Sequence, residues 1–149
     1  MEKDYVILVD DNDRQTGICE KLKAHEEGLM HRAFSIFLFN NKGEFLLQQR
    51  ASEKYHTGGL WSNTCCSHPR PDENMEDALQ RKLFQEMGIH CPVREAFQFS
   101  YQARLDNSLI ENELDHVYFG EFNDMPNPNP AEVQNVSYTH LTLPPICSV

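Results

Sequence analysis

The sequence has little positive charge and no long apolar run. Its 13 lysine and arginine residues stand against 23 aspartate and glutamate residues, which gives a formal net charge of −10. So acidic a chain is unsuited to nucleic acid or an anionic membrane surface, and we expect neither as a partner. No segment reaches the roughly 18–20 apolar residues of a membrane span. The first residues lack the basic start and apolar stretch of a secretory signal, so we expect a cytoplasmic protein.

A disulfide framework is missing as well. The cysteines number five, which is odd, and they show no framework spacing, so we expect reduced thiols. Cys65 and Cys66 are adjacent, and neighbouring side chains on a strand point in different directions. At most one of the two is therefore expected to serve a given site. The 149 residues suffice for one domain with a real core.

Short apolar and aromatic runs predict strands at 5–9, 31–40, 43–51, 97–105 and 113–122, with 31–40 covered on both faces. The segment 10–17 is expected to be a turn-rich connection. A helix is predicted from Asn74, its N-cap, to Gly88, the left-handed residue that ends it. Its apolar stripe consists of Met75, Ala78, Leu79, Leu83 and Met87. Strands, then a helix, then strands predict an α+β sandwich.

Three histidines and two glutamates are candidates for a metal site. His25 and His31 precede or open the first long apolar run, and His68 lies in NTCCSHP. Glu111 and Glu113 are two residues apart, so on a strand both carboxylates face the same side. Such a pair in a largely apolar hairpin is costly unless a cation neutralises it. Imidazole with carboxylate suits Mn²⁺, Zn²⁺ or Fe²⁺ better than Ca²⁺. The alternative is that the five are scattered surface residues.

The predicted helix carries a degenerate Nudix box, G-x5-E-x7-R-E-U-x-E-E-x-G-U, where U is apolar. Ser67 replaces the first glycine, and Lys82 and Gln85 replace two of the three clustered glutamates. Those glutamates normally hold the Mg²⁺ that activates water against a diphosphate, so their loss undermines hydrolysis. Glu86 could still bind one Mg²⁺, and Lys82 could meet a phosphate. The alternative is an ordinary amphipathic core helix. The residues that match the pattern are Glu73, Arg81, Leu83, Glu86, Gly88 and Ile89.

Cys66 is a candidate acid or base. A thiol beside His68 and a metal site can have a lowered pKa, which prepares it for proton transfer. The alternative is a buried, inert cysteine. Phe34, Trp61 and Tyr101 are expected in the core, although in an active site aromatic faces could stabilise a carbocation.

With the degenerate Nudix box, CCSH and IENE in one chain, the sequence resembles the type 1 isopentenyl-diphosphate isomerases of the Nudix superfamily. The match runs from about Tyr5 to about Tyr138 and is visible in EKLKAHEEGLMHRAFSIFLFN, LLQQRASEKYHTGGLWSNTCCSHP and SYQARLDNSLIENELDHVYFGE. The resemblance implies a Nudix-type mixed β-sheet sandwich with flanking helices. It also implies a monomeric enzyme of isoprenoid biosynthesis that interconverts isopentenyl diphosphate and dimethylallyl diphosphate.

The resemblance further implies roles for individual residues. Cys66 and Glu113 match the two catalytic residues, with Tyr101 beside Glu113. Glu86, assisted by the Cys66 carbonyl, would bind Mg²⁺ that contacts the substrate diphosphate. The catalytic metal, Mn²⁺ or Zn²⁺, would be held by His25, His31, His68, Glu111 and Glu113. The substrate would be bound by Lys21, Arg50, Lys54, Lys82 and Trp61.

The C-terminus departs from the family pattern. Residues 1–136 are expected to form the catalytic core, and residues 137–149 a tail that matches nothing in the family. The family continues into elements that enclose the substrate, so turnover by this chain is left open. Two other functions compete with the isomerase. A Nudix hydrolase of diphosphates is opposed by the missing glutamates and leaves Cys66 unexplained, and a catalytically inert metal-binding fold is supported only by the tail.

Overall fold

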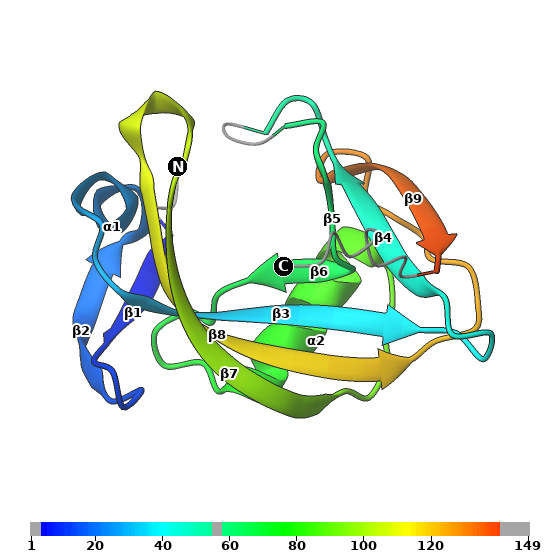
Figure 1. Ribbon diagram of the computed structural model, residues 1–149, viewed down its shortest axis with the longest axis horizontal. Coiled ribbons are helices and arrows are strands. Elements are labelled where there is room, and N and C mark those ends of the chain that lie inside the picture. The colour runs from blue at the N-terminus through cyan, green and yellow to red at the C-terminus, as the bar shows by residue number, and fades with distance from the viewer. Residues whose placement is uncertain (1–3, 55–57, 141–149) are drawn as a thin grey trace, which may run out of the picture.

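The computed structural model describes residues 4–54 and 58–140, which form a curled mixed β-sheet with helices packed against it (Figure 1). No helix within these ranges is long and apolar enough to cross a membrane. The elements in chain order are β1 Tyr5–Val9, β2 Gln15–Glu20, α1 Lys21–Glu27, β3 His31–Phe39, β4 Phe45–Arg50, β5 Trp61–Ser62, β6 Cys65–Ser67, α2 Met75–Met87, β7 Arg94–Arg104, β8 Ile110–Glu121 and β9 Val133–Thr139.

Strand β3 is the centre of the sheet. It pairs in parallel with β8 along its whole length, from His31 opposite Glu113 to Phe39 opposite Glu121. On its other side it pairs antiparallel with β6, where Ser35 lies opposite Cys66. Strand β7 is antiparallel to β8, and β9 is antiparallel to β4. Parallel and antiparallel pairing in one sheet, with helices against it, confirms the predicted α+β fold class.

The two faces of β3 have different environments. Phe34, Ile36 and Leu38 are buried in the core on the face that α2 covers, which is the far face in Figure 1. Phe37 and Phe39 lie on the opposite face and are only partly buried. The prediction that this strand is covered on both faces therefore holds for its first part, where His31 and Ala33 on that opposite face are buried, and is wrong for Phe37 and Phe39. The aromatic run resembles a doubly buried strand in sequence, but helix α2 covers one face alone.

Helix α2 has the predicted bounds. The Asn74 side chain accepts a hydrogen bond of 2.8 Å from the Asp77 amide, and Gly88 ends the helix with φ 64°. Just before the helix, Glu73 accepts two hydrogen bonds from the Arg81 guanidinium, at 2.7 and 2.9 Å. This bidentate pair ties the preceding loop to the second turn of α2. The Glu and Arg of the Nudix box thus have a structural role in this chain.

Several short elements were not predicted. Strand β2 begins at Gln15, inside the segment expected to be a connection, and α1 starts without a side-chain cap. Strands β5 and β6 have two and three residues and are fixed by their pairing with β4 and β3. Strand β9 runs to Thr139, whereas residues 141–149 of the expected tail lie outside the described residues. The boundary at residue 137 stays a prediction.

Gly88 offers a test of the packing at the end of α2. A Cβ there would overlap the Asn127 carbonyl oxygen, in addition to the strain of positive φ. At Gly43, φ is 74° and a Cβ would meet nothing within 4 Å. We expect Gly43→Ala to lower the free energy of unfolding by about 1 kcal/mol, and Gly88→Ala by roughly 3 kcal/mol or more. Urea unfolding of both variants measures the difference, and equal losses would contradict the steric account.

Candidate active site

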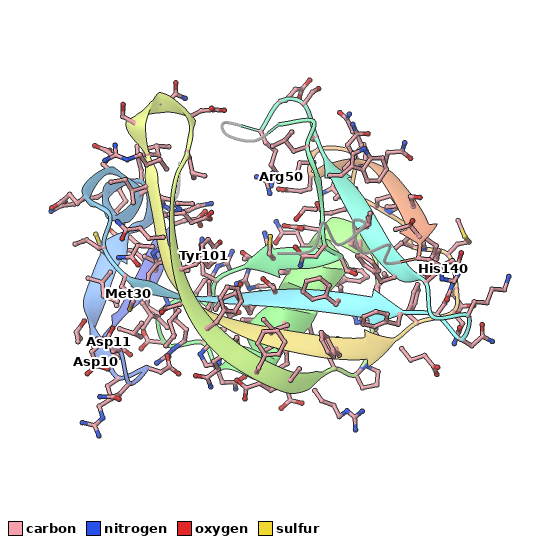
Figure 2. All side chains as sticks on the ribbon, viewed as in Figure 1. Asp10, Asp11, Met30, Arg50, Tyr101 and His140 are labelled. Carbon is pink, nitrogen blue, oxygen red and sulfur yellow. The ribbon has the colours of Figure 1, made fainter. Side chains whose placement is uncertain are left out.

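A cavity of about 330 Å³ is lined by residues of β3, β6, β7 and β8 together with Lys82 and Glu86 of α2. This volume lies within the range of small-molecule sites, about 300–1,000 Å³. Figure 2 shows Arg50 and Tyr101 on opposite sides of this opening. The predicted site residues among its lining are Lys21, His25, Arg50, Lys54, Trp61, Cys66, His68, Lys82, Glu86, Tyr101, Glu111 and Glu113. His31 is fully buried and lies directly against Glu113.

His31 and Glu113 meet because β3 and β8 pair in parallel with these residues opposite each other. Nε2 of His31 lies 3.4 Å from Oε2 of Glu113 and makes no hydrogen bond, whereas Nδ1 lies 3.1 Å from the Leu29 carbonyl oxygen. Burial alone would lower the pKa of His31, but the adjacent Glu113 carboxylate outweighs it and raises the pKa. The Leu29 contact fixes the ring, so Nε2 is directed at the carboxylate.

Two further histidines lie beside His31. The ring centroids of His25 and His31 are 5.2 Å apart, and those of His31 and His68 are 6.1 Å apart. Nδ1 of His25 lies 2.8 Å from the Lys21 carbonyl oxygen. Burial is the main cause that lowers the pKa of His25 and of His68. Both rings therefore favour the neutral form, which has a nitrogen lone pair available for a metal.

Glu111 and Glu113 both line the cavity, as their two-residue spacing on a strand predicts. Burial and then the charge of Glu113 raise the pKa of Glu111 to about 7. The Tyr101 hydroxyl donates a hydrogen bond of 2.7 Å to Oε1 of Glu113. Burial and the Glu113 charge raise the pKa of Tyr101, so this hydroxyl stays protonated and remains a donor.

The donor set around His31 fits a divalent cation. Within residues 4–54 and 58–140, no three His, Cys, Asp or Glu side chains are already arranged to hold a metal ion. However, Nε2 of His31 and Nδ1 of His68 are buried without a hydrogen-bond partner, next to two mutually repelling carboxylates. Buried polar atoms without partners are unfavourable, and a bound cation would satisfy the nitrogens and neutralise the carboxylates together.

Four cationic side chains converge on another part of the cavity wall. They are contributed by α1, β4, the segment that follows β4, and α2: Lys21, Arg50, Lys54 and Lys82. Burial lowers the pKa of Lys21, and the positive charges of the other three lower it further. All four side chains line the same cavity, so their charges act in one region. An anionic group bound among them would relieve that repulsion.

Two acidic residues lie among these cations: Glu132, which forms an ion pair with Lys54, and Glu86. Glu86 is almost fully buried, with Oε2 3.2 Å from Nζ of Lys82 and Oε1 accepting a 3.0 Å hydrogen bond from the Gln48 amide. Lys82 occupies a position where the Nudix box has a glutamate. The structure thus has an ion pair where a hydrolase would have two carboxylates for Mg²⁺.

Cys66 faces the cavity and Cys65 faces the core. The pairing of Ser35 with Cys66 and of Ile36 with Cys65 sends the two thiols to opposite faces, so only one reaches the site, as expected. Burial raises the pKa of the Cys66 thiol to about 12, and the charges of Glu86 and Glu113 contribute to the rise. The lowered pKa was expected beside a metal site, and the protein side chains by themselves raise the pKa instead.

Some lining residues were missed by sequence reasoning, notably Ser35, Ser62 and Asn63. The Asn63 amide donates to the carbonyl oxygens of Ile36 and Cys65, both at 3.0 Å, and so holds the β5–β6 turn on β3. Ser35 could have been identified from the sequence, because it is a polar residue inside an apolar strand. Asn63 lies in a short turn, and nothing in the sequence around it indicated a place in the site.

The three aromatic residues expected in the core do not all lie there. Phe34 is fully buried in the core, as expected. Trp61 and Tyr101 instead line the cavity, and Trp61 remains 46% exposed. Their rings therefore border the space where a substrate would lie rather than the α2 core.

Comparison with known proteins extends these observations. The NUDIX domain family model matches residues 29–145. The chain is 53% identical to an isopentenyl-diphosphate Delta-isomerase of Pectobacterium atrosepticum, over 89% of this chain and 74% of that protein. It is 55% identical to an isopentenyl-diphosphate Delta-isomerase of Burkholderia multivorans, over 88% of this chain and 74% of that protein.

Solved structures show the same fold at low sequence identity. A Deinococcus radiodurans protein superposes with a TM-score of 0.74 at 17% identity, covering 92% of this chain and 83% of its own. A MutT protein from Methanosarcina mazei has a TM-score of 0.63 at 20% identity, covering 74% of this chain and 77% of its own. Together with the family match and the close relatives, this shows that the chain belongs to the isopentenyl-diphosphate Delta-isomerase family of NUDIX-domain proteins.

Proposed function

We propose that this protein interconverts isopentenyl diphosphate and dimethylallyl diphosphate by protonating and deprotonating the C5 chain. The observation that carries the proposal is one cavity containing both Cys66 and the Tyr101–Glu113 pair, with four cationic side chains in its wall. Proton donors and acceptors beside an anion-binding wall suit an allylic rearrangement of a diphosphate ester.

The diphosphate is held by Lys21, Arg50, Lys54 and Lys82, whose converging charges favour an anion. Glu86, with the Cys66 carbonyl, is the proposed ligand of Mg²⁺ that contacts the diphosphate. The Lys82 ammonium is a point charge, so it cannot make the two parallel hydrogen bonds to a phosphate that an arginine guanidinium makes. Trp61 borders the apolar C5 chain.

The reaction needs an acid on one face of the substrate and a base on the other. An unactivated alkene is a very weak base, and its protonation gives a tertiary carbocation. Loss of a proton from the neighbouring carbon then places the double bond in its new position. Glu113, hydrogen-bonded to Tyr101, donates the first proton and Cys66 removes the second. A forward turnover leaves Glu113 deprotonated and Cys66 protonated, and proton exchange with solvent restores both groups before the next turnover. In the reverse reaction the two residues exchange these roles.

The His–Glu cluster is proposed to hold the catalytic divalent metal, Mn²⁺ or Zn²⁺, through His25, His31, His68, Glu111 and Glu113. A cation bound there supplies positive charge that favours the ionised forms of nearby acids, including the Cys66 thiol. Without that charge, burial keeps the pKa of Cys66 at about 12. The aromatic faces of Trp61 and Tyr101 border the cavity where a carbocation forms and stabilise it by cation–π attraction.

A Nudix hydrolase is the second candidate, and the Lys82–Glu86 ion pair argues against it. Hydrolases of this fold rely on clustered carboxylates to bind the Mg²⁺ that activates water. Here one of those positions is occupied by an ammonium group 3.2 Å from the remaining carboxylate. Gln85 occupies another. Water activation at this place is therefore disfavoured.

Proton exchange with solvent tests the proposed reaction directly. Incubation of the purified chain with isopentenyl diphosphate, Mg²⁺ and Mn²⁺ in D₂O is expected to yield deuterium-labelled dimethylallyl diphosphate, followed by NMR. Deuterium appears because the acid and base exchange with solvent between turnovers. Release of inorganic phosphate without isomerisation would instead establish the hydrolase.

Cys66→Ala is expected to lower kcat by roughly 10³-fold, because general acid–base groups contribute about 10²–10⁴-fold. Binding of the product diphosphate, measured by calorimetry, is expected to be unchanged because the cationic wall is intact. Cys19→Ala, which removes a thiol on β2, is the matched control and should retain wild-type turnover. Substantial activity of Cys66→Ala would exclude this residue as the base.

Metal binding can be measured from the thermal stability of the protein, without an activity assay. Mn²⁺ at about 100 times its Kd is expected to stabilise the fold by about 2.7 kcal/mol, seen as a rise in Tm of several degrees after chelator treatment. His68→Ala removes a proposed ligand, so the rise should largely disappear. His140→Ala, at an exposed position beyond β9 (Figure 2), is the control and should keep the full rise. An undiminished rise in His68→Ala would contradict the ligand assignment.

A further inference from the structure

The buried amide side chain of Gln48 lies between the apolar core and the cavity. Leu46 and Gln48 are two residues apart on β4, so their side chains share a face of the strand. Leu46 is fully buried in the core and Gln48 is 3% exposed, whereas Arg50, a further two residues along, lines the cavity. A polar side chain buried at this boundary needs hydrogen-bond partners, and the proposed reaction gives Gln48 no role.

Gln48 donates both of its amide hydrogens to buried acceptors. Its Nε2 makes a hydrogen bond of 2.8 Å to the Thr64 carbonyl oxygen and another of 3.0 Å to Oε1 of Glu86. A side-chain amide nitrogen has two hydrogens, so both are used. Carbonyl and carboxylate oxygens are acceptors, so the nitrogen of the Gln48 amide, and not its oxygen, has to face them.

Thr64 gives this amide a firm support. Thr64 is fully buried, and its hydroxyl donates a hydrogen bond of 2.6 Å to the Leu46 carbonyl oxygen and accepts one of 3.0 Å from the Leu38 backbone amide. These two bonds tie Thr64 to both β4 and β3. The Gln48 amide could turn away from Glu86 only by leaving the buried Thr64 carbonyl without its partner, which is costly.

The two oxygens of the Glu86 carboxylate therefore have different partners. Oε1 is held by buried donors, the Gln48 amide and, at 3.6 Å, the Cys65 thiol. Oε2 lies 3.2 Å from Nζ of Lys82, a side chain that lines the cavity. Oε2 is thus the oxygen that Glu86 offers to a ligand in the cavity. Cys65, the cysteine that faces the core, contributes to holding the other oxygen.

We propose that Gln48 is a positioning residue that presents Glu86 to the cavity through Oε2 alone and thereby favours Mg²⁺ over Ca²⁺ at this carboxylate. This role rests on the proposed function, in which Glu86 binds the Mg²⁺ that contacts the diphosphate. Mg²⁺ requires near-ideal octahedral geometry, which one fixed carboxylate oxygen fits, whereas Ca²⁺ readily takes both oxygens of a carboxylate in a looser shell. Because the Gln48 amide occupies Oε1, the first arrangement is favoured over the second. Hydrogen bonds from outer groups to metal ligands are worth about 10–100-fold in metal affinity.

The test is the affinity of the full chain for dimethylallyl diphosphate, measured by calorimetry without divalent metal, with Mg²⁺ and with Ca²⁺. The factor by which each cation strengthens binding is its gain, and in the wild type the Mg²⁺ gain should exceed the Ca²⁺ gain. Gln48→Met keeps the length of the side chain but removes both N–H donors. It is expected to reduce the Mg²⁺ gain about tenfold and to leave the Ca²⁺ gain unchanged or larger. Metal-free binding depends on the cationic wall, so it should stay close to that of the wild type and shows that the cavity is formed.

Two further variants control for local structure. Gln49→Met is the matched control, because Gln49 is the next residue on β4 and its amide donates instead to the Gly59 carbonyl oxygen at 3.0 Å. Both gains should equal those of the wild type in this variant. Gln48→Asn keeps a polar amide in the buried position but is one methylene shorter, so it cannot span Thr64 and Glu86. It should lose the Mg²⁺ gain as Gln48→Met does, and it tests the role if the methionine variant does not fold.

Glu86→Gln separates the role of Gln48 from the proposed function. If Glu86→Gln loses the Mg²⁺ gain while the Gln48 variants keep it, Glu86 remains the Mg²⁺ ligand and the role of Gln48 is overturned. Mg²⁺ and Ca²⁺ gains that fall by the same factor in the Gln48 variants would show local support of the fold without selectivity, which also overturns it. A Mg²⁺ gain that survives in Glu86→Gln would overturn the ligand assignment and the role of Gln48 together, and would leave the deuterium test of isomerisation unaffected.

Discussion

The parallel pairing of β3 with β8 is the interaction on which the rest of the molecule depends. Its register sends Phe34, Ile36 and Leu38 into the core beneath α2, while His31 and Glu113 meet on the opposite face. Side chains alternate along a strand, so a slip of one residue would exchange the two faces. The burial of three large apolar side chains therefore fixes the position of the polar site, because both depend on the same register.

The cavity and the sheet next to it have three chemical environments. On one side of the cavity are histidines and carboxylates from β3, β8 and nearby segments, and on another is a wall of lysine and arginine. Elsewhere on β3, β7 and β8 the rings of Phe37, Phe97 and Phe119 pack edge to face. This separation is compatible with the proposed binding of an anion by a protein with a net charge of −10, because four neighbouring cations act locally and their field is not that of the whole surface. The acidic composition argues against polyanionic partners but not against a small diphosphate.

The Nudix box shows how a fold is kept while its chemistry changes. Glu73 and Arg81 form a bidentate pair that fixes the loop before α2, and Gly88 has the positive φ that ends the helix. These positions serve the structure. Lys82 and Gln85 occupy positions that serve hydrolysis, and their side chains bring an ammonium and an amide where carboxylates would bind Mg²⁺. Function therefore follows from the site and not from the fold that carries it.

The sequence by itself determined the long elements and the family. The N-cap, apolar stripe and glycine of α2 are local signals, and the two-residue spacing of Glu111 and Glu113 fixes their common side wherever β8 lies. The proposed roles of the site residues and the tail boundary at 137 stay predictions. Tertiary structure alone decided the short strands β5 and β6, the raised pKa of Cys66 and the pairing of Lys82 with Glu86. Two- and three-residue strands exist only through their partners, and a pKa depends on burial and on charges such as Glu113, which is 47 residues away from Cys66 in the chain.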